Sequence, residues 1–96
     1  YKNSLLHAEQ VAITKIAAEI GTPFYCYSAA TLRRHFQVFA EGLKGRKAKI
    51  CYAVKANDNL SVLRVLKEAG AGADVVSEGE IRKCLAAGFT PQDIVF

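Results

Sequence analysis

One lysine stands where a buried strand is predicted to end. Lys55 follows the apolar run 50–54 and precedes the polar residues 57–59. An apolar run of this length between loop residues is typical of a strand buried on both faces, as in a parallel sheet. Because α/β sheets and β/α barrels bind ligands at the carboxyl ends of their strands, Lys55 is a candidate for chemistry. An amine held there against apolar packing loses its proton more readily, and a neutral amine attacks aldehydes.

Several roles are open to this amine. It could form a Schiff base with an aldehyde cofactor, which is one established use of a lysine in enzymes. It could instead hold a phosphate group as a point charge, or simply close the strand and extend into water. Position alone favours the phosphate contact or the strand end over the Schiff base.

Four further residues could line the same site. Ala53 lies two residues before Lys55, so strand alternation predicts that both side chains point to one side, and the small alanine leaves room for a flat ring. A barrel interior also needs small residues for packing alone. Asp74 belongs to the next predicted strand, beside Lys55 if the two strands are neighbours, and its carboxylate could hold the lysine amine in place. Ser77 and Glu80 follow it, and their spacing equally matches a helix capping box.

The elements that position these residues alternate along the chain. Helices are predicted over 7–20, from Ser28 to about 43, over 60–69 and from about 78 to 87, with strands over 24–27, 50–54, 73–76 and 94–96. The inward side chains are predicted to be Leu32, Phe36, Phe39 and Leu43, then Leu60, Leu63 and Leu66 with Val62 and Val65 widening that face, then Ile81, Cys84 and Leu85. Such alternation implies parallel strands with right-handed crossovers, in an open sheet or a barrel.

Length and composition bound the class of protein. A complete β/α barrel needs about 250 residues, so a chain of 96 residues is expected to be a fragment of one. No apolar run approaches the roughly twenty residues that span a bilayer, so no membrane association is predicted. Three widely spaced cysteines indicate reduced thiols in a cytoplasmic protein and no metal site. The basic residues 44–49 lack interleaved aromatic residues, which favours a solvated loop over nucleic-acid binding.

Several blocks, in order, carry a family resemblance. They read TPFYCYSAATLRRHF, then YAVKAN, then NLSVLRVLKEAGAGADVVSEGEIRKCLAAGF, then TPQDIVF. Residues 22–96 thereby resemble the amino-terminal part of the pyridoxal-phosphate-dependent decarboxylases with an alanine-racemase-type barrel, most closely the diaminopimelate decarboxylase family. The resemblance implies an α/β fold, a partial (β/α)8 barrel of the TIM type. It assigns residues 23–96 to the first part of that barrel and residues 1–22 to a segment associated with a β-rich second domain.

The resemblance also implies an activity. Lys55 matches the family's cofactor lysine, which binds pyridoxal 5'-phosphate, and Ala53, Asp74, Ser77 and Glu80 match positions near that cofactor. The implied reaction converts meso-2,6-diaminopimelate to L-lysine and CO2 in lysine biosynthesis, within a homodimer. The remaining cofactor and partner-subunit groups of the family lie further along its chains, so this segment alone is expected to be inactive.

Other assignments stay open beside this one. Ornithine and arginine decarboxylases share the fold but usually carry a cysteine where this chain has Ala56, and alanine racemases usually continue as VKANAYGHG. Glu78 stands where diaminopimelate decarboxylases usually have glycine, which weakens the substrate assignment more than the cofactor assignment. A barrel that carries pyridoxal phosphate without catalysis and a small interaction module without any cofactor are the non-enzymatic alternatives.

Overall fold

The computed structural model describes residues 1–96, which divide into two compact units, Tyr1–Ala30 and Thr31–Phe96. Each unit is described by itself. The assignment of residues 1–22 to a segment associated with a second domain stays a prediction.

The first unit begins with a small hairpin rather than a helix. Strands β1 (His7–Ala8) and β2 (Val11–Ala12) pair antiparallel, and helix α1 (Ile13–Ile20) follows directly. The prediction of a helix from residue 7 is therefore wrong for its first six residues. The apolar residues at helical spacing all lie within α1, and Glu9 adopts a positive φ of 54°, which a helix does not allow. Gly21 ends α1 as predicted, with its N–H bonded to the carbonyl of Ala17.

The predicted strand over 24–27 is absent, since these residues form no ladder with any other segment. Tyr25 and Tyr27 instead stack on each other with ring centroids 6.4 Å apart, and both remain exposed. Aromatic residues favour strands because they pack on a pleated, half-buried surface, and this segment has no neighbouring strand to provide one.

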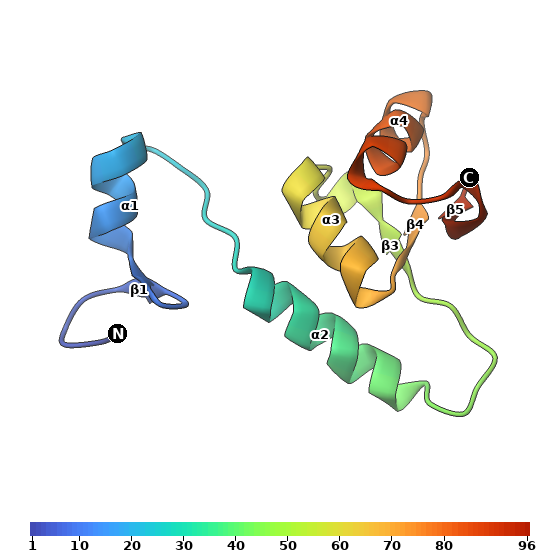
Figure 1. Ribbon diagram of the computed structural model, residues 1–96, viewed down its shortest axis with the longest axis horizontal. Coiled ribbons are helices and arrows are strands. Elements are labelled where there is room, and N and C mark those ends of the chain that lie inside the picture. The colour runs from blue at the N-terminus through green and yellow to red at the C-terminus, as the bar shows by residue number, and fades with distance from the viewer. The chain divides into compact units, whose positions relative to one another are not determined.

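The second unit contains the predicted alternation of strands and helices (Figure 1). Its elements are α2 (Ala29–Gly42, which starts at the unit boundary), β3 (Cys51–Ala53), the 3-10 helix η1 (Val54–Ala56), α3 (Leu60–Ala69), β4 (Gly72–Asp74), α4 (Glu78–Ala87), the 3-10 helix η2 (Pro91–Asp93) and β5 (Ile94–Val95). The three strands form one parallel sheet in the order β3-β4-β5. Parallel pairing and the bounds of α3 are confirmed.

The core lies between this sheet and its helices. One buried cluster joins Val54, Leu63, Ala73, Val75, Cys84, Ala87 and Phe89. A second joins Val62, Leu66 and Ala71, against which Leu32 and Phe36 of α2 pack. Gly72 fits there because any Cβ would lie 2.8 Å from the carbonyl oxygen of Asp93 and 2.8 Å from the sulfur of Cys51.

Three of the predicted inward side chains face outward. Leu60 is 39% exposed, Leu85 is 45% exposed and Phe39 is 61% exposed. Leu60 is the first residue of α3, and Val62 is buried with Leu63 and Leu66 in its place. On α4, Ala87 takes the place predicted for Leu85 because it lies three residues after the buried Cys84, on the same face of the helix.

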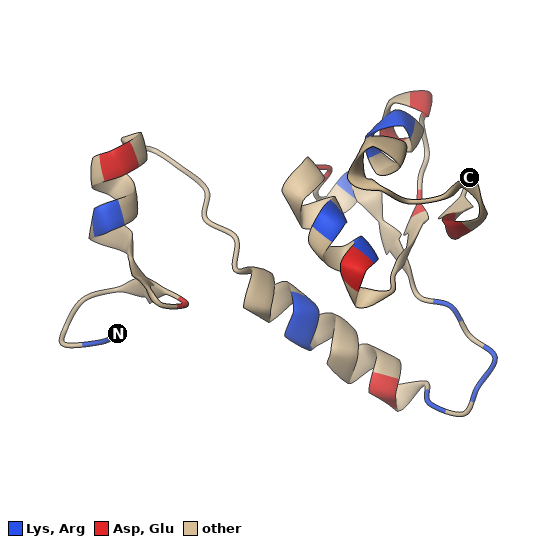
Figure 2. Ribbon diagram, viewed as in Figure 1, with Lys and Arg blue, Asp and Glu red and all other residues tan.

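The predicted basic loop is confirmed as a connection between α2 and β3 (Figure 2). Lys44 pairs with Glu41 and Lys49 pairs with Asp93. None of the helices has the length and apolar character needed to cross a membrane.

Candidate active site

Lys55 lies just beyond the carboxyl end of β3, as predicted, but in a turn rather than in the strand. The strand ends at Ala53, and η1 carries Lys55 between the fully buried Val54 and the exposed Ala56. The side chain of Lys55 is exposed and takes part in no hydrogen bond or ion pair. The apolar surroundings expected around its amine are therefore not supplied by these 96 residues, whereas a free amine at the ligand-binding edge is present.

The parallel register brings Ala53 beside Asp74. The two residues are Cα partners in the β3–β4 pairing, and both end their strands at the same edge of the sheet. Asp74 is exposed, so its carboxylate faces outward at this edge. The premise of alternation from Ala53 to Lys55 does not hold, because Lys55 belongs to a 3-10 turn. The edge nevertheless holds the small side chain, the carboxylate and the lysine within one short stretch of structure.

Ser77 and Glu80 are held by the start of α4. The hydroxyl of Ser77 accepts a hydrogen bond from the amide of Glu80 at 3.2 Å, which confirms the predicted cap. The carboxylate of Glu80 reaches back, but it accepts from the amide of Val76 at 2.8 Å rather than from Ser77. These two hydrogen bonds hold the side chains of Ser77 and Glu80 against the segment that joins Asp74 to α4.

A second cap, which sequence reasoning missed, secures the loop after Lys55. The side-chain oxygen of Asn59 accepts from the amides of Ser61 at 2.9 Å and Val62 at 3.4 Å, so Asn59 is the N-cap of α3. Asp58 forms an ion pair with Lys83 of α4. An asparagine directly before a helical pattern is the signal that could have revealed this cap.

At the amino ends of the strands, opposite Lys55 and Asp74, the chain forms an ion pair. Lys49 precedes β3 and Asp93 precedes β5, and their side chains meet at 2.6 Å. The hydrogen bond from Lys49, followed by that from Thr90, lowers the pKa of Asp93 to about 2. In the core, burial and then the charge of Glu80 raise the pKa of the Cys84 thiol, which stays neutral and packs. Cys26, Cys51 and Cys84 are all free, and no metal-binding cluster exists.

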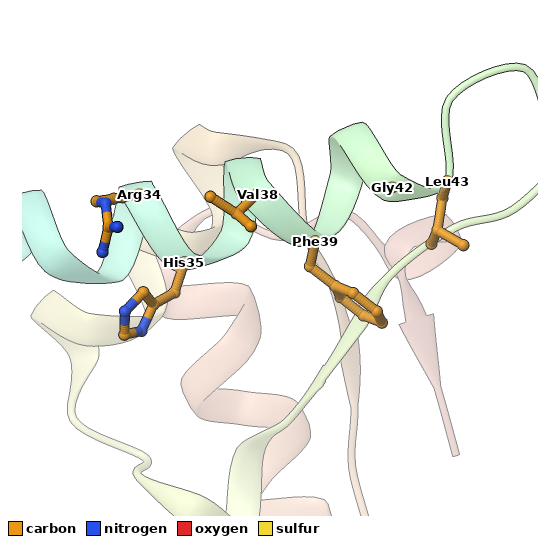
Figure 3. A pocket seen from close by; sticks show the side chains of 6 residues that line it. All are labelled: Arg34, His35, Val38, Phe39, Gly42 and Leu43. Carbon is orange, nitrogen blue, oxygen red and sulfur yellow. The ribbon is translucent and has the colours of Figure 1, made fainter.

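A hollow of the surface lies along α2, and none of the predicted site residues lines it. It has a volume of about 590 Å³ and is lined along α2 by Arg34, His35, Val38, Phe39, Gly42 and Leu43 (Figure 3). Its apolar floor consists of side chains that the helix leaves uncovered, Val38 and Phe39 above all. No lysine lines it, so it offers no primary amine for an aldehyde cofactor.

Known proteins share both the sequence and this geometry. Residues 29–96 match the family described as pyridoxal-dependent decarboxylase, pyridoxal binding domain. The diaminopimelate decarboxylase of Pseudomonas aeruginosa is 47% identical over 96 residues, which cover 100% of this chain and 23% of that protein.

Two solved structures have the same fold. A protein of Aquifex aeolicus superimposes with a TM-score of 0.90 and 39% identity over 98% of this chain and 23% of its own. Diaminopimelate decarboxylase from Helicobacter pylori, solved in complex with L-lysine, superimposes with a TM-score of 0.80 and 44% identity over 85% of this chain and 21% of its own. The chain therefore has the fold of the first part of such a barrel and spans about a quarter of these relatives.

Proposed function

This chain belongs to the pyridoxal-dependent decarboxylases, in the part that forms their pyridoxal-binding domain, and from that membership we propose a reaction for the full-length protein. In this proposal the full-length protein converts meso-2,6-diaminopimelate to L-lysine and CO2, using pyridoxal 5'-phosphate. The observation that carries this proposal is the free amine of Lys55 at the carboxyl edge of a parallel sheet, in a chain 47% identical to a diaminopimelate decarboxylase.

The residues at this edge fit the cofactor. An aldehyde needs an unengaged amine, which Lys55 offers, and a flat ring needs a small neighbour, which Ala53 offers. When bound, pyridoxal phosphate provides an electron sink for the electron pair that remains at Cα as the carboxylate leaves. Lys55 holds the cofactor through Nζ and afterwards moves a proton at that atom. A proton then replaces the departed CO2 at the substrate carbon.

The acidic and polar residues at the edge have positioning roles in this proposal. The carboxylate of Asp74 accepts a hydrogen bond from Nζ of Lys55 and keeps the amine in place between steps. Ser77 and Glu80, fixed by the start of α4, border the cofactor beside Asp74. Their caps reduce the number of arrangements that the loop can adopt, which favours a preformed site.

The substrate, the assembly and the compartment are parts of the same proposal. The Helicobacter pylori relative was solved with L-lysine, the product of the proposed reaction, and this supports a basic amino acid as substrate. We propose a homodimer in the cytoplasm. The three free cysteines support a reducing compartment.

The first experiment measures L-lysine formed from meso-diaminopimelate by the full-length protein with pyridoxal phosphate. Wild type is compared with Lys55→Ala and with Lys47→Ala, which removes an exposed lysine of the α2–β3 loop. The proposal predicts product from wild type and Lys47→Ala and none from Lys55→Ala. A loss of activity in both variants would show that the Lys55 result is not specific to the site.

The remaining outcomes separate the alternatives. Release of CO2 from ornithine or arginine, with none from diaminopimelate, would replace the substrate and keep the role of Lys55. Borohydride-trapped cofactor at Lys55 without turnover of any amino acid would indicate a cofactor carrier. Absence of any trapped adduct at Lys55 would refute the cofactor assignment itself.

A further inference from the structure

The turn that carries Lys55 is short, exposed and held at both ends. Before it, Val54 is completely buried in the core. After it, the amide of Asn57 donates to the carbonyl of Val54 at 3.1 Å, and the side chain of Asn57 accepts from the amide of Asn59 at 3.0 Å. Only Lys55 and Ala56 lie between these two anchors. The position of the lysine backbone therefore depends on how firmly Asn57 is held.

Tyr52 supplies the remaining contact to Asn57. Its hydroxyl donates a hydrogen bond to the Asn57 carbonyl at 3.2 Å, in a partly buried place. This bond spans the turn from the strand before Lys55 to the residue after it. Both backbone polar groups of Asn57 are thus engaged, one with Val54 and one with Tyr52.

The ring of Tyr52 is itself fixed by packing. It contacts the cluster that contains Leu63 and Val75 and also the cluster that contains Val62 and Leu66. A ring held between two parts of the core gives its hydroxyl a fixed position, because few side-chain rotamers remain. Phenylalanine at this position would keep the packing of the ring and remove the bond to the turn.

We propose that Tyr52 is a positioning residue for Lys55, acting through the hydrogen bond to the Asn57 carbonyl; this inference rests on the proposed function. The strand, the tyrosine and the turn form a closed loop that holds the Lys55 backbone just beyond Ala53, the residue that pairs with Asp74. The lysine side chain stays free to move within it. An amine on a fixed backbone reaches an aldehyde in the productive geometry more often than one on a loose turn.

The test uses the full-length protein and pyridoxal phosphate as the probe. Wild type, Tyr52→Phe and Tyr1→Phe are titrated with the cofactor and reduced with borohydride, and labelling of the Lys55 peptide is measured by mass. Tyr1→Phe is the matched control, since it removes a hydroxyl from a side chain that is 89% exposed. Amide exchange over residues 54–59 and the melting temperature are measured in the absence of cofactor.

The expected result is specific to the turn. In Tyr52→Phe the cofactor concentration for half-labelling rises by about 3- to 10-fold, the range expected for one lost hydrogen bond. The amides of residues 55–57 exchange faster, while the melting temperature stays close to that of Tyr1→Phe. Unchanged half-labelling and unchanged exchange would overturn the proposal. A fall in melting temperature with exchange faster throughout the sheet would also overturn it, because the hydroxyl would then serve stability in general.

Failure of the proposed function gives a different pattern. If wild type shows no labelling at Lys55, the cofactor assignment fails, and amide exchange alone decides the role of Tyr52. Faster exchange confined to residues 55–57 would then support the hold on the turn, and unchanged exchange would refute it.

Discussion

Asp93 and Lys49 show how a single ion pair can make stability depend on pH. Hydrogen bonds from Lys49 and Thr90 lower the pKa of Asp93 from 3.8 to about 2. A carboxyl group whose pKa is lower in the folded state binds fewer protons there than in the unfolded state. It therefore stabilises the fold above pH 3.8, and this stabilisation is lost as the pH falls towards about 2.

We expect Asp93→Asn to lower the free energy of unfolding at pH 6, and we expect the difference from wild type to shrink as the pH falls through this window. Urea unfolding of the full-length protein at a series of pH values measures the difference. A difference of constant size across the series would contradict the assignment of the lowered pKa to Asp93.

The chemistry-bearing residues were more predictable than their surroundings. Lys55 could be placed at a strand end from the sequence because loop residues follow the apolar run, whereas Asp74 was placed within the predicted strand 73–76 and ends β4 in the structure. The 3-10 turn could not be predicted, since its first residue, Val54, continues the apolar run and neither Lys55 nor Ala56 is a residue that marks a turn. The hydrogen bond from Tyr52 to Asn57 could not be predicted from the sequence either, because it depends on how the Tyr52 ring packs between two core clusters.

At the scale of elements, α3 depends on the cap that Asn59 provides. We expect Asn59→Ala to destabilise the full-length protein by about 1 kcal/mol, because the amides of the first turn lose their acceptor. The melting temperature and the urea midpoint measure this loss. Asn59→Asp keeps a capping oxygen and should restore most of the stability. Equal stability of Asn59→Ala and wild type would show that the hydrogen bonds from the amides of Ser61 and Val62 contribute nothing.

Elements with strong local signals were predicted well. The bounds of α3 follow from its apolar spacing and from Gly70, whose φ of 104° suits the residue after a helix. Segments whose structure depends on a neighbouring strand were predicted poorly. The aromatic run 24–27 has strand-forming residues and no strand beside it, and the hairpin before α1 has only two residues on each side. Short antiparallel pairs leave almost no periodic pattern in a sequence.

At the scale of the whole molecule, the sheet has two unpaired edges, because β3 and β5 each pair on one side only. Phe39 and Val38 add an uncovered apolar face on α2. We expect the isolated chain of 96 residues to release no CO2 from meso-diaminopimelate under conditions in which the full-length protein does. Free edges and exposed apolar side chains should also make it self-associate.

Assays of the two proteins at equal cofactor concentration, with light scattering of the isolated chain, measure both effects. Turnover by a monodisperse isolated chain would refute the expectation.

The sheet contains two successive strand–helix repeats, β3 to β4 and β4 to β5, which have the same length but differ in one feature. The register joins Cys51 to Gly72 and Ala73 to Ile94, a separation of 21 residues in both cases, and α3 and α4 each contain 10 residues. The difference lies in where a three-residue 3-10 helix is inserted. In the first repeat η1 precedes α3 and carries Lys55. In the second repeat η2 follows α4 and carries Asp93. The same three-residue insertion therefore presents an unpaired lysine at one end of the strands and anchors an ion pair with Lys49 at the other, without any change in the length of the repeat.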